Sequence, residues 1–140
     1  MMESEQPDIT KAALLIIVDR QLLVARTRGK DFFIPPGGKP EGAETIIQAG
    51  IREGEEELGI TIQASDLKSV GVFSAPAAGQ ENRMLNMEGL LVKAYMGEPA
   101  PYSEVEELNL INSFNSPGLK LGTILEHDIL PLLKERGLID

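Results

Sequence analysis

The stretch GKPEGAETIIQAGIREGEEELGI, residues 38–60, carries the signals on which the rest of the chain depends. It contains six glutamates and two basic residues. At 3.6 residues per turn, residues 44–58 are expected to form about four helical turns with Glu53, Glu56 and Glu57 on one side. Such like charges repel, and closely spaced carboxylates are the ligands that hard cations such as Mg²⁺ use. The pattern indicates a metal-binding helix, although a solvated acidic surface would contain the same run.

The opposite side of the expected helix is apolar. It carries Ile47, Ile51 and Leu58, with Gly50 and Gly54 in the same stripe, so the helix has a core face opposite its acidic face. Each interior glycine costs about 0.8–1 kcal/mol relative to alanine. Either the helix packs closely against a neighbour there or it is locally loosened, and we favour close packing.

The spacing within this stretch resembles the signature of the Nudix hydrolases. That signature reads Gly, five residues, Glu, seven residues, Arg-Glu, an apolar residue, one residue, Glu-Glu, one residue, Gly and an apolar residue. At a usage of roughly 1 in 15 per fixed letter, chance would match a window on the order of 10⁻⁸ of the time. Gly54 stands where the family has its first apolar residue. The seven fixed letters match at Gly38, Glu44, Arg52, Glu53, Glu56, Glu57 and Gly59.

The resemblance implies an α/β fold, the Nudix α/β/α sandwich with a mixed β-sheet. It also implies a pyrophosphohydrolase in which Glu53, Glu56 and Glu57 hold Mg²⁺ or Mn²⁺. Arg52 would orient one of these carboxylates, and Glu44 would brace the junction between loop and helix. Three glycines are expected to shape the backbone at the site: Gly37, Gly38 and Gly59.

The general base is left open by the sequence. Glu53 is one candidate, and in the family an acidic residue from the region after residue 97 often completes the metal site or acts as base. Glu98, Glu104 and Glu107 are the options there. We favour Glu104 because it follows a Pro-containing, flexible stretch, whereas Glu107 adjoins an expected strand.

Basic and polar residues outside the helix are candidate substrate contacts. Arg26, Arg28 and Lys30 precede the acidic stretch, and Lys39 lies within it. Such charges either contact ligand phosphates or only keep a loop soluble. Asn82 and Arg83 lie in residues 74–83, which have few bulky side chains and are expected to form a long, functional loop.

Composition limits the protein class. The chain has 140 residues, 42% of them hydrophobic, which suits one domain; we expect a flexible lead at 1–10 and a single domain at 11–140. It has no cysteine, which excludes a disulfide framework, a thiolate zinc site and a cysteine nucleophile. Neither a secretory signal nor an apolar run of roughly 20 residues is present. We expect a cytoplasmic protein without a membrane partner.

The net charge of −9 argues against nucleic acid polymers as partners, because that binding depends on Lys and Arg. A small nucleotide remains compatible, since Mg²⁺ can bring phosphates to an acidic site. We consider three functions: hydrolysis of a nucleoside diphosphate linked to another moiety, pyrophosphohydrolysis of (deoxy)nucleoside triphosphates, and non-catalytic nucleotide sensing. Many relatives pair, so the resemblance also allows a homodimer.

Short apolar runs separated by turn signals predict the remaining elements. A polar turn at 19–21 favours two strands over one helix through 12–26. An amphipathic helix near the C-terminus is expected, with Pro131 as a candidate kink and His127 as a surface or packing residue. Strands are expected at 12–18, 22–26, 32–34, 60–64, 68–73, 87–96 and 107–111.

Overall fold

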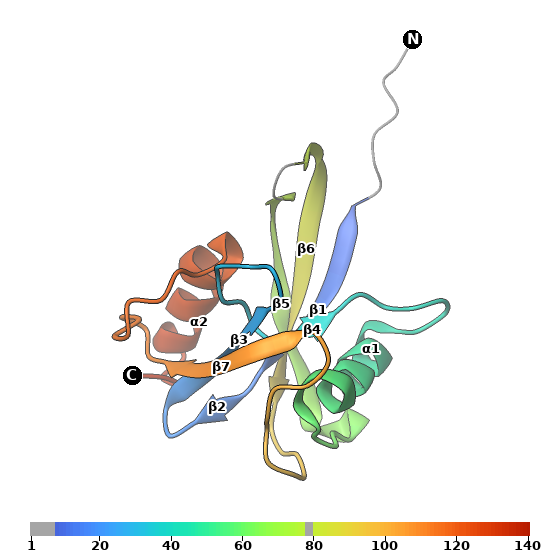
Figure 1. Ribbon diagram of the computed structural model, residues 1–140, viewed down its shortest axis with the longest axis horizontal. Helices are drawn as coiled ribbons and strands as arrows, with labels where there is room; N and C mark the ends of the chain where they lie inside the picture. Colours follow the sequence, from blue (N-terminus) through green and yellow to red (C-terminus); the bar gives the residue numbers. More distant parts are fainter. Residues whose placement is uncertain (1–7, 78–79) are drawn as a thin grey trace.

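A computed structural model describes residues 8–77 and 80–140 of the chain. One helical segment, α1 with η1, follows the first four strands, and the other, η3 with α2, follows the last strand (Figure 1). The elements in chain order are β1 (Ile9–Leu15), β2 (Ile17–Val18), β3 (Gln21–Thr27), β4 (Gly37–Gly38), α1 (Ile46–Glu53), η1 (Gly54–Leu58), η2 (Ala64–Asp66), β5 (Leu67–Ala77), β6 (Gln80–Val92), β7 (Val105–Ile111), η3 (Leu125–Ile129) and α2 (Leu130–Glu135).

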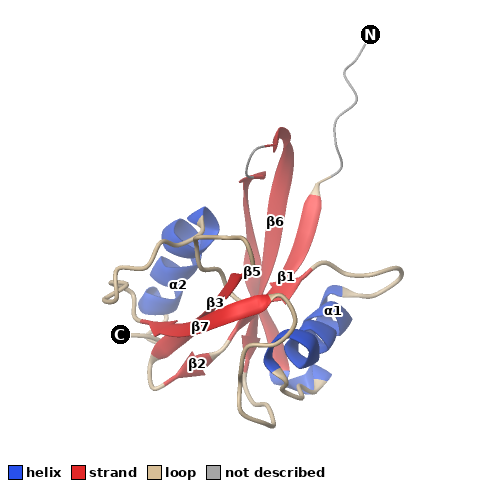
Figure 2. Ribbon diagram, in the orientation of Figure 1, coloured by secondary structure: helices blue, strands red, loops and turns tan. Residues whose placement is uncertain are grey.

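The strands form two sheets between the helices. The first has the order β4-β1-β6-β5 and is mixed, because β1 and β6 run parallel while the other pairs are antiparallel. The second is antiparallel, with the order β2-β3-β7. In Figure 2 the helix α1 lies to one side of the strands and α2 to the other. This arrangement confirms the α/β/α sandwich with a mixed sheet.

Strand β1 lies at the centre of the fold and is buried on both faces, as its lack of alternation predicts. Leu14 packs in the cluster that contains Leu58 and Ile60 from the end of the first helical segment. Its neighbour Leu15 packs in the cluster that contains Ile129 and other residues of η3 and α2. β1 therefore connects the layer that carries the acidic helix to the C-terminal helical layer.

The turn between β2 and β3 confirms two strands in this region. Val18 pairs with Gln21 across a two-residue connection. Asp19 and Arg20 both have positive φ, at 50° and 62°, as a type I′ hairpin turn requires. Arg20 also donates to the Asp140 carboxylate at 2.5 Å, which ties the hairpin to the C-terminus.

Several expected elements differ in the structure. Residues 32–34 and 60–64 make only isolated bridges, the first because Pro35 and Pro36 follow directly. Residues 74–83 do not form a long loop, since β5 extends to Ala77 and β6 begins at Gln80. The small side chains there gave no strand signal, yet cross-strand pairing continues and Ser74 donates to Asn86 at 2.5 Å.

At both ends of the chain, the expected structure also differs from the observed one. Of the expected lead at 1–10, residues 1–7 lie outside the described part, while Ile9 and Thr10 already belong to β1. The C-terminal helix begins at residue 123 and contains a π-helical turn, η3, directly before Pro131, which lies near the start of α2. His127 is exposed. No helix within residues 8–77 and 80–140 combines the length and apolar character needed to cross a bilayer.

Candidate active site

The acidic helix begins at a well-formed cap. The Thr45 hydroxyl accepts from the Gln48 N–H at 3.1 Å, and the Thr45 N–H donates to the Gln48 side chain at 2.9 Å. This reciprocal pair is a capping box, so α1 starts at Ile46 and not at residue 43 or 44. Glu44 therefore precedes the helix, and its side chain is available to the residues that follow.

A π-helical turn ends the acidic segment and redistributes its glutamates. Gly54–Leu58 form η1, directly after α1, and such wide turns recur at functional sites. The three glutamates expected on one side are not equivalent: Glu53 and Glu57 are partly buried and line a cavity, whereas Glu56 is exposed and outside the cavity lining. Gly54 is buried, and a Cβ there would lie 2.9 Å from Ile62 Cδ1, so close packing is confirmed.

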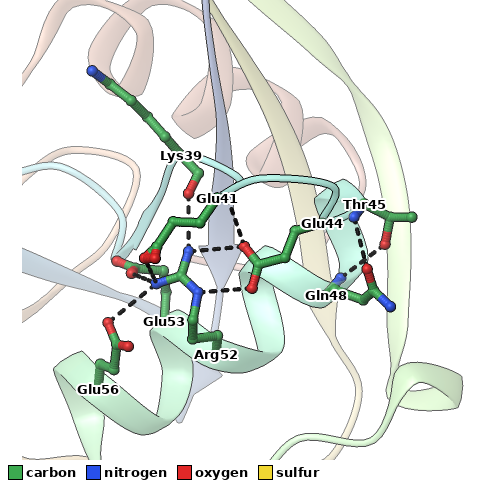
Figure 3. Close-up of polar contacts among 8 residues, drawn as sticks. All are labelled: Lys39, Glu41, Glu44, Thr45, Gln48, Arg52, Glu53 and Glu56. Atoms are coloured by element: carbon green, nitrogen blue, oxygen red, sulfur yellow. Dashed lines mark hydrogen bonds and ion pairs between the residues drawn. The ribbon is translucent and has the colours of Figure 1, made fainter.

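Arg52 is the centre of the polar network drawn in Figure 3. Its guanidinium binds both oxygens of Glu44, from Nε at 2.8 Å and from Nη2 at 3.0 Å. It also donates to Glu53 and, at 3.1 Å, to Glu56. A further bond reaches the Lys39 carbonyl at 2.9 Å. Arg52 thus fixes the loop before the helix and two helix carboxylates together.

The Glu44 carboxylate carries out the bracing that the motif predicted. Besides Arg52, it accepts from the Glu41 backbone N–H at 2.9 Å, which closes the turn before the helix. The hydrogen bonds from Arg52 hold the pKa of Glu44 below its usual value, and those from Glu44 raise the pKa of Arg52. The pair therefore stays ionised near neutral pH.

Glu57 has the most perturbed carboxyl group at the site. Burial raises its pKa to about 7, and the nearby Glu53 and Glu104 carboxylates add to the increase. Its Oε1 accepts from the Gly37 backbone N–H at 2.8 Å, which partly opposes the effect. Burial likewise raises the pKa of Glu53. Two interacting carboxylates that resist full ionisation are a common feature of cation sites.

The glycines at the site allow close backbone approaches. Gly37 has φ of 147°, and a Cβ there would lie 1.9 Å from the Ala12 carbonyl oxygen. A Cβ at Gly38 would lie 2.5 Å from Glu53 Oε2, so this glycine makes room for the Glu53 side chain. Gly59 ends η1 with φ of 69° against the Tyr102 ring.

A cavity of about 860 Å³ opens beside these groups. Its acidic part includes Glu53, Glu57 and Glu104, and its apolar part lies between β5, β6 and the segment before η3. Four lysines also line it: Lys11, Lys30, Lys39 and Lys120. The volume is within the range of small-molecule sites.

The chemistry of the donors fits Mg²⁺ or Mn²⁺, because carboxylate oxygens from Glu53 and Glu57 face one cavity. In the described part of the chain, no three acidic or histidine side chains are already gathered around a common point. Arg52 holds the Glu56 carboxylate and also binds Glu53. Glu56, the third predicted ligand, is exposed and outside the cavity lining.

The predicted substrate contacts divide into two groups. Lys39 lines the cavity. Arg26 and Arg28 do not, because Arg26 donates to Glu107 at 3.1 Å and Arg28 lies 3.5 Å from Glu106. Asn82, exposed on β6, and Arg83, partly buried on the same strand, are also outside the cavity lining.

The candidate bases separate in the same way. Glu104 lines the cavity and interacts with Glu57. Glu107 binds Arg26, and Glu98 is exposed outside the cavity. The structure thus places the favoured candidate, Glu104, next to the acidic helix.

Sequence reasoning missed two cavity lysines. Lys11 was taken only as the boundary of an apolar run, although a lysine at the head of a buried strand is itself a signal. Lys120 comes from the segment before η3 and pairs with Asp31 at 2.9 Å. No local pattern pointed to it, because its place at the cavity depends on tertiary packing.

Comparisons with known proteins agree with this geometry. The family model described as NUDIX domain matches residues 8–111. The m7GpppN-mRNA hydrolase NUDT17 of Xenopus laevis is 30% identical over 73 residues, which cover 49% of this chain. The match covers 25% of that relative, so the chain spans about a quarter of its length.

Two solved structures illustrate the similarity of fold. The MutT NUDIX hydrolase from Burkholderia pseudomallei superposes with a TM-score of 0.73 and 24% identity, covering 94% of this chain and 98% of that one. A bifunctional NMN adenylyltransferase/ADP ribose pyrophosphatase from Francisella tularensis, solved with AMP and a manganese ion, gives a TM-score of 0.62 and 22% identity. That match covers 93% of this chain and 42% of the other.

Proposed function

The chain belongs to the Nudix hydrolase family, and from this premise we propose that it cleaves the pyrophosphate linkage of a nucleoside diphosphate joined to another moiety. The observation that carries the proposal is the shared cavity of Glu53, Glu57 and Glu104 with several lysines. Carboxylates and ammonium groups on one cavity suit a ligand that is itself a metal-bound phosphate.

Glu53, Glu56 and Glu57 would hold Mg²⁺ or Mn²⁺, which neutralises charge on phosphate oxygens and makes a bound water more acidic. Arg52 keeps Glu53 oriented through their hydrogen bond. The Gly37 N–H does the same for Glu57 at 2.8 Å. These contacts leave the second oxygen of each carboxylate as a candidate ligand atom.

Glu104 is the proposed general base. Its side chain has no hydrogen bond or ion pair with another residue in the described ranges, whereas Glu53 is already bound by Arg52. A carboxylate with free lone pairs at the cavity surface can accept the proton of an attacking water. Glu53 is the alternative base, because it faces the same cavity.

The apolar part of the cavity is proposed to hold the nucleoside or its attached moiety. Ile9, Leu85 and Met87 form one wall, and Leu121 lies among the lining residues of another segment. Phe32 is the aromatic ring among the cavity residues. The Francisella tularensis protein, a bifunctional NMN adenylyltransferase/ADP ribose pyrophosphatase, makes a linked diphosphate the first substrate class to test.

Incubation of the protein with Mg²⁺ and a nucleotide panel tests the proposal. Linked diphosphates should yield two monophosphate products. Release of inorganic pyrophosphate from triphosphates would replace the proposal with the second function, and no turnover across the panel would favour a sensor. Glu55→Gln is the matched control for substitutions of the site, because Glu55 is exposed and outside the cavity lining.

A further inference from the structure

Lys11 lies on β1, and Lys39 directly follows β4, the short strand that pairs with β1. In the antiparallel pair of β1 and β4, Ala12 is opposite Gly38 and Ala13 is opposite Gly37. Lys11 and Lys39 each adjoin the paired residues Ala12 and Gly38, and both side chains line the same cavity. Like charges brought close together repel each other. This arrangement therefore needs an explanation beyond the stability of the fold.

Neither lysine side chain forms an ion pair in the described part of the chain. Within residues 8–77 and 80–140, the side chains of Lys11, Lys39 and the nearby Lys30 make no hydrogen bond and no ion pair. Figure 3 shows the Lys39 side chain pointing away from Arg52, to which only its carbonyl is bound. Lys120, the fourth lysine of the cavity, differs because it pairs with Asp31.

The environment of Lys11 disfavours the positive charge on its side chain. It is partly buried on the first strand of the core and lines the cavity. Burial lowers the pKa of Lys11, and Lys39 is the charged neighbour with the largest effect in the same direction. Glu57 and Glu53 act in the opposite direction but are not within ion-pair distance. A simple counter-charge for the glutamates would be expected to form such a pair.

We propose that Lys11 and Lys39, with Lys30, form an anion subsite that binds a phosphate group next to the acidic helix. All three line the cavity that also contains Glu53 and Glu57. An anion between the lysines would remove their repulsion and replace lost hydration with charge-assisted hydrogen bonds. The inference rests on the proposed function only for the identity of the natural ligand, a phosphate of the substrate.

The test measures binding without turnover. Titration calorimetry of the full chain with inorganic pyrophosphate, in a chelator that removes divalent cations, should detect binding. Lys11→Met should raise the dissociation constant for pyrophosphate by about tenfold or more, as expected for loss of a charged contact. Lys11→Arg should retain most of the affinity. Lys68→Met is the matched control, because Lys68 is exposed on β5 and does not line the cavity.

A second measurement distinguishes a binding lysine from a structural one. Without anion, Lys11→Met should melt at the same temperature as the wild type or higher, because it removes repulsion and the burial of a charge. The wild type should gain melting temperature with pyrophosphate, and the variant should not. A lower melting temperature without anion, together with unchanged pyrophosphate affinity, would overturn the subsite and assign Lys11 to stability.

Turnover is a separate outcome. A protein that binds pyrophosphate through Lys11 but hydrolyses no nucleotide would retain the subsite and lose the proposed function. A nucleotide hydrolase whose wild type binds no pyrophosphate, or whose Lys11→Met variant keeps the wild-type dissociation constant, would retain the function and lose the subsite.

Discussion

Glu57 accepts a hydrogen bond from the backbone N–H of Gly37 at 2.8 Å, which joins the end of the acidic helix to strand β4. The two residues come from opposite sides of the signature loop. Because Gly37 also lies against the Ala12 carbonyl of β1, the carboxylate has a fixed position relative to the core. One oxygen is oriented by the backbone, and the other is left for a ligand.

We expect Glu57→Gln to reduce turnover by orders of magnitude and to leave the fold intact. The amide oxygen can still accept from Gly37, but the negative charge that a cation requires is lost. Steady-state kinetics with Mg²⁺, compared with Glu55→Gln and with circular dichroism of each variant, would measure this. A rate close to wild type in Glu57→Gln would contradict the assignment of Glu57 as a metal ligand.

Glu57 should also make the stability of the metal-free protein depend on pH. Its pKa is raised from the usual 4.5 to about 7 in the folded state, so the folded protein binds the proton more tightly. The resulting stabilisation of the folded state by protonated Glu57 is complete below pH 4.5, and it is lost as pH rises through about 7. At roughly 1.4 kcal/mol per pKa unit, the loss is about 3 kcal/mol.

Chemical denaturation in a chelator at pH 5 and pH 8 would measure this difference. Glu53, Glu104 and Lys11 also act on Glu57, so the informative quantity is the change relative to Glu57→Gln. In that variant, the free energy of unfolding should fall much less between pH 5 and pH 8 than it does in the wild type. An equal decline in both proteins would show that Glu57 is not its source.

Features that depend on local spacing were predictable from sequence. The motif predicted that Arg52 would orient one helix carboxylate, and its contacts with Glu44, Glu53 and Glu56 all connect residues within one turn-and-helix unit. Lys11 was not identified, because its place beside Lys39 depends on the register between β1 and β4.

Long-range pairing also explains why Arg26 lies outside the cavity lining. Arg26 was grouped with other cations near the acidic stretch, but β3 pairs with β7 and places Arg26 opposite Glu107. Strands at 68–73 and 87–96 were predicted, but their extension toward the turn of the β5–β6 hairpin was not, because it depends on cross-strand contacts that a single segment does not contain.

Gly54 should not tolerate the apolar residue that the family signature has there. Leucine at position 54 would meet Ile62, whose Cδ1 lies 2.9 Å from the position of an added Cβ. We expect Gly54→Leu to destabilise the protein by about 1–3 kcal/mol through overpacking. Gly54→Ala should cost less, because the end of the Ile62 side chain can shift and alanine favours the helix. Thermal denaturation of both variants tests this, and a more stable Gly54→Leu would show that space exists.

Arg52→Lys should impair both structure and activity despite keeping the charge. A lysine cannot bind Glu44 through two parallel hydrogen bonds while also reaching Glu53 and Glu56. We expect a melting temperature below that of wild type and a lower kcat. Arg28→Lys provides the control, since Arg28 is exposed and its side chain makes long contacts, at 3.4 Å to the Ser103 carbonyl and 3.5 Å to Glu106. Equal effects of the two substitutions would argue against a special role for the Arg52 network.

Tyr102 should position Glu104 at the cavity. The loop before β7 is attached to the end of η1 because the Tyr102 N–H donates to the Glu57 carbonyl at 3.0 Å and its ring covers Gly59. A Cβ at Gly59 would lie 2.5 Å from this ring, so Gly59→Ala should displace it. We expect Gly59→Ala and Tyr102→Ala to lower kcat more than they raise KM, and Tyr102→Phe to behave as wild type. If Glu104 is the base, Glu104→Gln should lower kcat in the same way; an unchanged kcat with only a lower melting temperature would restrict Tyr102 to stability.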